Sequence, residues 1–234
     1  MIRSIFKIVY LLSFLFSTLS CTTKKSDKPV QSLKENLVQK QKQTQENNII
    51  NEGDIIFQTS ISSQSKAIQL ATHSKYSHVG IIFKSEKDST NFLVLEAVQP
   101  VKFTPLKEWI KRGQDAHFVI KRLKNADKIL TFEALHKMKN LGKTFLGKNY
   151  DLYFEWSDER IYCSELVWKI YKEGIDIEIG ELEKLSSFDL ESKAVREKMK
   201  ERYKNQIPYD ENVISPAAIF QSDKLISVPN PTNF

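Results

Sequence analysis

The chain has 234 residues, of which 41% are hydrophobic and 27% are charged, and its formal net charge is +6. This length and apolar content suffice for one domain with an ordinary core and some chain to spare. The positive balance is modest, and no block of Lys and Arg longer than a pair is interleaved with aromatic residues, which argues against a nucleic-acid partner. Contact with anionic lipid or glycan surfaces is compatible with this charge.

Residues 1–20 have the pattern of a secretory signal: two basic residues, an apolar run over residues 8–16, then small and polar residues. The apolar run is shorter than a membrane-spanning helix requires. Thr18-Leu19-Ser20-Cys21 resembles the lipobox of bacterial lipoproteins, so we expect the signal to be removed and Cys21 to be lipidated. An ordinary secretory signal or an uncleaved anchor is the alternative. Loss of the two basic residues leaves 33 Lys and Arg against 29 acids, about +4.

Residues 21–51 are expected to form the lipidated N-terminus and a flexible tether, because Lys, Gln, Asn, Ser and Glu dominate them and little apolar surface can be buried. The folded domain is expected to span residues 52–234. The chain has two cysteines, and assigning Cys21 to the lipid leaves Cys163 without a disulfide partner. An unpaired thiol in an exported protein indicates either pairing between molecules or thiol chemistry.

The segments after Gly53 read as a mixture of strands and helices. Residues 55–57, 77–83, 92–98, 117–123 and 225–228 have the β-branched and aromatic content of strands. Helical periodicity is predicted at residues 64–72, 104–110, 127–141, 161–171, 189–203 and 217–220. Thr104-Pro105 and Ser215-Pro216 are read as helix starts, and Gly142 and Gly174 as helix ends.

Cys163 is expected at the start of its helix, on one apolar stripe with Leu166, Val167 and Ile170. A helix N-terminus presents free N–H groups and partial positive charge, which lower a thiol pKa and can hold an oxyanion. The simpler interpretation is that Cys163 is a small buried hydrophobic residue. Because Cys163 is expected to have no disulfide partner, the catalytic interpretation is favoured.

His78 and Glu96 lie in two predicted strands. Alternation places His78, Gly80 and Ile82 on one face, and Gly80 leaves room beside the imidazole. Glu96 is the only charge in its apolar segment, so it needs a partner unless it reaches solvent at the strand end. A cysteine nucleophile needs an imidazole base that a carboxylate orients. Cys163, His78 and Glu96 supply these groups if the Cys163 helix packs against the sheet face that carries the other two.

The aromatic segment at residues 147–160, which includes Tyr150, is expected either to wall a substrate cleft or to fill the core. His73 and His117 have no Cys or carboxylate at metal-ligand spacing, and His136 is expected at the surface of its predicted helix. No CxxC, HExxH or phosphate-binding glycine loop occurs, so the sequence predicts no metal, nucleotide or other cofactor.

Five segments stand out in a fixed order: Gly53-Asp54-Ile55-Ile56-Phe57-Gln58-Thr59-Ser60, Ile68-Gln69-Leu70-Ala71-Thr72, Tyr76-Ser77-His78-Val79-Gly80-Ile81, Tyr150-Asp151 with Phe154, and Tyr162-Cys163-Ser164-Glu165-Leu166-Val167. Together they resemble the YiiX family of permuted papain-like cysteine hydrolases, which are related to the NlpC-type cell-wall peptidases. The resemblance covers nearly all of residues 53–228, and the order of the segments is more specific than any one of them.

The resemblance implies an α+β, permuted papain-like fold, with an antiparallel sheet or partly open barrel against which the nucleophile helix packs. It also implies Cys163 as nucleophile, His78 as general base and Glu96 as the residue that orients it, with Tyr162 and Tyr150 as candidate oxyanion or pocket residues. The expected function is a lipid-anchored thiol amidase or peptidase of the bacterial cell envelope, facing the periplasm or exterior. The alternatives are a lipid- or ester-directed acyltransferase and a catalytically silent binding module.

Overall fold

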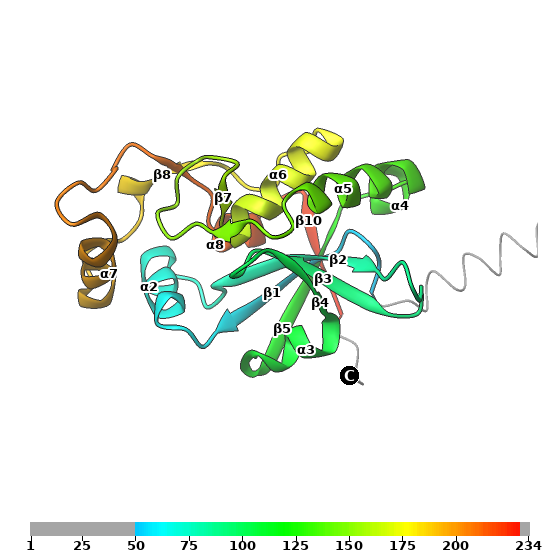
Figure 1. Cartoon of the computed structure of the whole chain (residues 1–234), viewed down its shortest axis with the longest axis horizontal. Helices are drawn as coiled ribbons and strands as arrows, with labels where there is room; N and C mark the ends of the chain where they lie inside the picture. The colour runs from blue at the N-terminus through cyan, green and yellow to red at the C-terminus, as the bar shows by residue number, and fades with distance from the viewer. Residues whose placement is uncertain (1–49, 230–234) are drawn as a thin grey trace, which may run out of the picture. The chain divides into compact units, whose positions relative to one another are not determined.

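The computed structural model describes residues 50–229, and an antiparallel sheet forms the centre of this part of the chain (Figure 1). Its strand order is β10-β5-β1-β2-β3-β4, and every neighbouring pair is antiparallel. The strands are β1 (Ile55–Ser60), β2 (His78–Lys84), β3 (Phe92–Glu96), β4 (Lys102–Pro105), β5 (Gly113–Leu123) and β10 (Leu225–Val228). This arrangement confirms the predicted α+β class.

Four short strands form two further pairs. The parallel pair is β6 (Asn149–Tyr150) with β7 (Arg160–Ile161), and the antiparallel pair is β8 (Glu183–Lys184) with β9 (Asn212–Val213). The helices are α2 (Ser63–Thr72), α3 (Leu106–Lys111), α4 (Ala126–Ile129), α5 (Phe132–Thr144), α6 (Cys163–Ile175), the 3-10 turn η1 (Leu185–Ser187), α7 (Lys193–Tyr203) and α8 (Pro216–Gln221). None of the helices in residues 50–229 has the length and apolar content of a membrane span.

The strand alternation of β2 separates two hydrophobic cores. Val79, Ile81 and Phe83 pack in one core with the apolar stripe of α6, while Ile82 packs in the other with Trp109 of α3. Figure 1 shows α5 and α6 on one side of the sheet and α3 on the other. The alternation is therefore as predicted, but α6 covers the face opposite to that of His78. The expectation that the Cys163 helix covers the His78 face is wrong.

The predicted helix at residues 127–141 is two helices, because the chain breaks at Leu130 and Thr131 caps α5 by accepting a hydrogen bond from the Ala134 N–H. Gly142 lies inside α5 rather than at its end. A Cβ on Gly142 would approach Leu95 Cδ2 to 2.4 Å, so glycine here permits the close packing of α5 on the sheet. Local periodicity does not reveal such a contact.

Two other predicted helix boundaries also differ. Thr104 belongs to β4, and Pro105 precedes α3 without a side-chain cap. Helix α6 continues through Gly174 to Ile175 and ends at Asp176, which adopts a left-handed conformation. The start of α8 is as predicted, since Ser215 accepts a hydrogen bond from the Ala218 N–H at 3.0 Å.

Candidate active site

Cys163 is the first residue of α6 and is almost completely buried. Tyr162 precedes it in an extended conformation (φ −102°, ψ 167°), and its N–H donates to the Glu165 carboxylate at 3.4 Å, which fixes the first turn. The predicted stripe of Leu166, Val167 and Ile170 is fully buried. The stripe anchors α6 in the core, and the sulfur is thereby held at the helix N-terminus.

His78 and Glu96 are brought together by the pairing of β2 with β3. His78 begins β2, Glu96 ends β3, and the His78 Nε2 and Glu96 Oε2 atoms are 2.7 Å apart. Gly80 makes this possible, because a Cβ there would lie 2.4 Å from Val94 Cγ1 and 2.8 Å from the Leu95 carbonyl oxygen. The space beside the histidine that the sequence predicted is thus filled by β3, which carries the carboxylate.

The second oxygen of Glu96 also accepts hydrogen bonds from protein groups. Oε1 accepts hydrogen bonds from Thr104 Oγ1 and from Arg112 Nη2, both at 2.5 Å. Trp109 stacks on the His78 ring with centroids 5.7 Å apart and an interplanar angle of 22°. Burial opposes ionisation of Glu96, but the hydrogen bonds from His78 and Thr104 and the charge of Arg112 outweigh it and lower the pKa of Glu96 to about 2.

The Cys163 thiol interacts with the His78 ring over the start of β2. Because Nε2 of His78 is hydrogen-bonded to Glu96, we infer that the Cys163 thiol interacts with the other ring nitrogen, Nδ1. Burial disfavours charge on both groups, but mutual attraction prevails: the pKa of Cys163 is lowered, and Cys163 and Glu96 raise the pKa of His78 to about 9. The Val79 backbone N–H further stabilises the thiolate. This arrangement can hold a thiolate–imidazolium pair at neutral pH.

The two candidate tyrosines have different environments. The Tyr150 hydroxyl accepts a hydrogen bond from Gln64 Nε2 at 3.0 Å and interacts with the Cys163 sulfur. Burial and the negative thiolate raise the pKa of Tyr150 well above its ordinary value, so its proton stays available for donation. The Tyr162 hydroxyl instead accepts from the Ile214 N–H at 3.1 Å. Tyr150 therefore presents its hydroxyl at the sulfur and is held by Gln64, whereas Tyr162 supplies the wall of a pocket.

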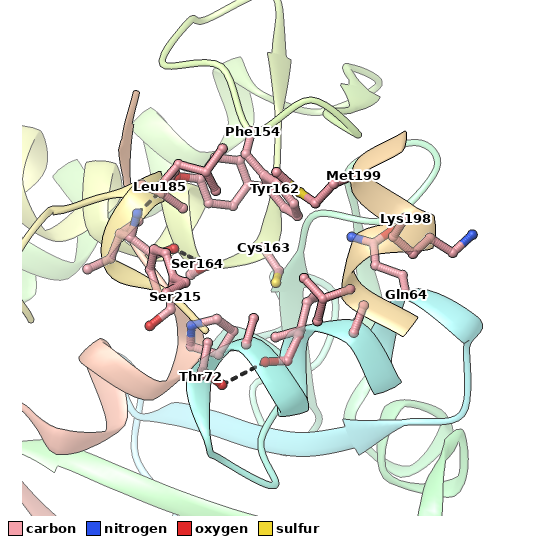
Figure 2. Close-up of a pocket in the computed structure, with 18 of the residues that line it drawn as sticks. Gln64, Thr72, Phe154, Tyr162, Cys163, Ser164, Leu185, Lys198, Met199 and Ser215 are labelled. Atoms are coloured by element: carbon pink, nitrogen blue, oxygen red, sulfur yellow. Dashed lines mark hydrogen bonds between the residues drawn. The ribbon is translucent and has the colours of Figure 1, made fainter. Parts of the chain in front are cut away.

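Two cavities meet at these residues. A pocket of about 660 Å³ of empty space is lined by Cys163 and Tyr162, and Figure 2 shows the sulfur at its centre. A cleft of about 1700 Å³ is lined by His78. Gln64, Ile68 and Tyr150 line both. Substrate can thus reach the sulfur and the imidazole from adjoining spaces.

Comparisons with known proteins agree with this arrangement. Residues 49–228 match the family described as permuted papain-like amidase enzyme, YaeF/YiiX. The uncharacterized protein YiiX of Escherichia coli K12 is 49% identical over 176 residues, which cover 75% of this chain and 84% of that protein. The crystal structure of metalloprotein YiiX from Escherichia coli O157:H7 matches with a TM-score of 0.72 and 48% identity over 77% of this chain and 97% of that one. The predicted family and fold are confirmed.

The name of that crystal structure refers to a metal, so the donor set of this chain is relevant. Among residues 50–229, no three or more His, Cys, Asp and Glu side chains are arranged to hold a metal ion. Nε2 of His78 and both oxygens of Glu96 are bonded to protein groups. The described residues therefore do not fit a resident metal.

Sequence reasoning missed Gln64, Thr104, Trp109 and Arg112. The sequence predicts Thr104 as a helix cap and Gln64 as an ordinary helical residue. The available signal is the Glu96 carboxylate, which needs a partner in its apolar segment, but the sequence does not identify that partner. Cys21 lies outside the described residues, as do residues 1–20 and most of the predicted tether.

Proposed function

The chain belongs to the YaeF/YiiX family of permuted papain-like amidases, and on this premise we propose that it is a thiol-dependent amidase or peptidase of the cell envelope. Cys163 is the nucleophile, His78 the general base and acid, and Glu96 the residue that orients the imidazole. The observation that carries the proposal is the 2.7 Å contact between His78 and Glu96, combined with the interaction of the His78 ring with the Cys163 sulfur. Buried apolar cysteines do not acquire such an oriented base.

The reaction begins when the Cys163 thiolate attacks the carbonyl carbon of an amide. The carbonyl π-electrons move to oxygen, and a tetrahedral oxyanion forms. His78 then donates its Nδ1 proton to the leaving nitrogen as the C–N bond breaks, which yields a free amine and a Cys163 thioester. Neutral His78 next takes a proton from water, the hydroxide attacks the thioester, and the carboxylic acid leaves as the thiolate is restored.

The oxyanion is stabilised by two donors, one at the start of α6 and one from β6. Cys163 is the first helical residue, so its backbone N–H has no acceptor within the helix. The Tyr150 hydroxyl is the second donor, because it accepts from Gln64 and retains its own proton. Positioned donors of this kind typically contribute a factor of about 100 to 1000 in kcat. Gln64 acts as a positioning residue for Tyr150.

Alkylation tests the proposed nucleophile without knowledge of the substrate. Iodoacetamide at about pH 6 is expected to label Cys163 faster than it labels glutathione, because an ordinary thiol has a pKa of about 8.5. His78→Ala should slow the labelling, whereas His136→Ala, an exposed change on α5, should not. Peptide mapping separates Cys163 from Cys21. Labelling of the wild type no faster than glutathione would favour the silent binding module.

We further propose that Cys21 carries the membrane anchor. The support is the signal-like pattern of residues 1–20 and the lipobox-like residues before Cys21. Several acyl CH₂ groups buried per chain would hold the protein stably on a membrane. Cys21→Ser should move the protein to the soluble fraction on cell fractionation, with Cys163→Ser as the matched control that stays in the membrane fraction. Equal membrane retention of Cys21→Ser and wild type would contradict lipidation.

A further inference from the structure

The loop of residues 151–159 connects two parts of the proposed site. Tyr150, the last residue of β6, precedes this loop, and β7 follows it and ends at Ile161, two positions before Cys163. Tyr150 and Ile161 are also partners in the parallel pairing of the two strands. The position of the 151–159 loop therefore affects how the Tyr150 hydroxyl lies relative to the Cys163 sulfur.

The 151–159 loop contains neither helix nor strand, and part of it is strained. Phe154 has a φ of +54°, a left-handed conformation that is unfavourable for residues with a Cβ atom. Such a conformation persists only where the surrounding structure fixes it. Asp151 fixes the first half of the loop, because its carboxylate accepts hydrogen bonds from the Tyr153 N–H at 2.8 Å and the Glu155 N–H at 2.6 Å. The second half is held by contacts from outside the loop.

Lys169 of α6 provides the buried contact to the second half of the loop. Its ammonium donates to the Ser157 carbonyl oxygen at 2.9 Å and to Asp158 Oδ1 at 2.7 Å. The Lys169 side chain is only 5% exposed, and its Nζ lies 5.2 Å from the centre of the Trp156 ring. Burial opposes the positive charge, but Asp158 and Glu165 outweigh it and raise the pKa of Lys169. The ammonium is therefore charged, and it binds the loop to α6.

The same ammonium reaches the first turn of α6. Its Nζ lies 2.9 Å from Oε1 of Glu165, which is fully buried, and the other Glu165 oxygen accepts the Tyr162 N–H at 3.4 Å. Burial raises the pKa of Glu165 to about 8, although the contact with Lys169 lowers it. Replacement of such a buried pair by apolar side chains is often neutral or stabilising, so stability alone does not account for it. What Lys169 provides is a fixed geometry between the loop and the turn that carries Cys163.

We propose that Lys169 is a positioning residue for the acylation step. By binding the 151–159 loop to α6, it holds the Tyr150 hydroxyl beside the Cys163 sulfur, where the oxyanion forms. Lys169 lines neither the pocket nor the cleft, so it acts through the loop and not on the substrate. Misplacement of a catalytic group by about 1 Å can cost a factor of about 100 in rate. The inference rests on the proposed function, because it takes Tyr150 as an oxyanion donor.

The test compares two reactions of Cys163. Acylation by 4-nitrophenyl acetate forms an oxyanion, whereas alkylation by iodoacetamide does not. The acylation rate is followed by nitrophenolate release and intact mass, assigned to Cys163 by peptide mapping, and divided by the rate of the same ester with glutathione. In Lys169→Met, which removes the charge with little change in volume, this rate should fall at least about fivefold, while the alkylation rate changes less than about twofold.

The matched control is Lys172→Met. Lys172 also lies on α6 and also contacts two carboxylates, those of Asp176 at 2.8 Å and Glu178 at 3.1 Å, but neither belongs to the loop. Lys172→Met should therefore retain the wild-type rates of acylation and alkylation. Lys169→Arg keeps the charge and the donors, and it should retain more of the acylation rate than Lys169→Met does.

Asp158→Ala removes one of the loop contacts from the other side and guards against misfolding of Lys169→Met. The Asp158 side chain is 70% exposed, and Lys169 keeps its contacts with Ser157 and Glu165 in this variant. The normalised acylation rate should fall about threefold, with little change in alkylation, because one of the two loop contacts remains. Glu178→Ala, which removes an exposed carboxylate that contacts Lys172, is the control and should leave both rates unchanged.

A double-mutant cycle with Tyr150→Phe examines whether Lys169 acts through the tyrosine hydroxyl. If it does, Lys169→Met should change the acylation rate less than about twofold once that hydroxyl is absent. A structural role unrelated to Tyr150 would instead give the same loss in both backgrounds.

The outcomes separate the positioning role from the proposed function. A loss that is confined to acylation and disappears in Tyr150→Phe supports the role of Lys169. Unchanged acylation in Lys169→Met and Asp158→Ala, equal losses in acylation and alkylation, or the same loss in both backgrounds overturns it and leaves the hydrolase intact. If the ester does not acylate wild-type Cys163 and iodoacetamide labels it no faster than glutathione, the proposed function fails, and the positioning role fails with it.

Discussion

Replacement of Glu96 by Gln isolates the charge that holds the imidazolium. The buried carboxylate accepts from His78 through Oε2 at 2.7 Å and from Thr104 and Arg112 through Oε1. A hydrogen bond to a charged group contributes about 1.5–3 kcal/mol, against about 0.5–1.5 kcal/mol for a neutral one. The difference of about 1–1.5 kcal/mol corresponds to about one pKa unit. The pKa of His78 should therefore fall from about 9 to about 8.

The amide also has one oxygen where the carboxylate has two. If the amide oxygen accepts the hydrogen bond from His78, the amide NH₂ group faces Arg112, which is also a donor. If the amide group is rotated so that its oxygen faces Arg112, His78 loses its acceptor. Either orientation weakens the network, so about one unit is a lower bound on the shift. The matched control is Glu86→Gln, an exposed carboxylate paired with Lys143, which should leave the pKa of His78 unchanged.

The assay is an NMR titration of ¹³C-histidine-labelled protein, in which the His78 resonance is identified by its loss in His78→Asn. Wild-type titration near the ordinary value of about 6.5 would refute the ion-pair reasoning. Equal pKa values of His78 in wild type and Glu96→Gln would also refute it.

The raised pKa of His78 also affects the stability of the fold. The raised pKa of His78 stabilises the fold fully below about pH 6.5, and this contribution is lost as pH rises through about 9, or about 8 in the variant.

Three further substitutions test other parts of the structure. Tyr150→Phe should lower the rate of Cys163 acylation at least about tenfold while iodoacetamide labelling changes little, because alkylation forms no oxyanion; equal losses in both would reassign Tyr150 to thiol activation. Gly80→Ala should destabilise the fold by about 1–3 kcal/mol in urea unfolding, because the new Cβ meets β3; unchanged stability would show that the strands can separate at no cost. Ser215→Ala should cost about 1 kcal/mol, and Ser222→Ala, beyond the other end of α8, should cost less; the reverse order would contradict the cap assignment.

The sequence by itself determined the local elements and their faces. Cys163 lies at the start of a helix with a buried stripe, and alternation correctly put His78 and Glu96 on one face of neighbouring strands. These features depend on the backbone periods of 3.6 and 2 and on turn and cap chemistry, which are written in adjacent residues. The order of the segments also identified the family.

Only the tertiary structure decided which surfaces meet. Helix α6 covers the face opposite to His78, so the sulfur reaches the imidazole over the start of β2 rather than across the sheet. Thr104 and Arg112 converge on Glu96 from 8 and 16 residues further along the chain, and Gln64 contacts Tyr150 across a separation of 86 residues. Periodicity gives the face on which a side chain lies but not the partner that covers it. That partner is selected by packing of the whole core and by the need to pair every buried charge.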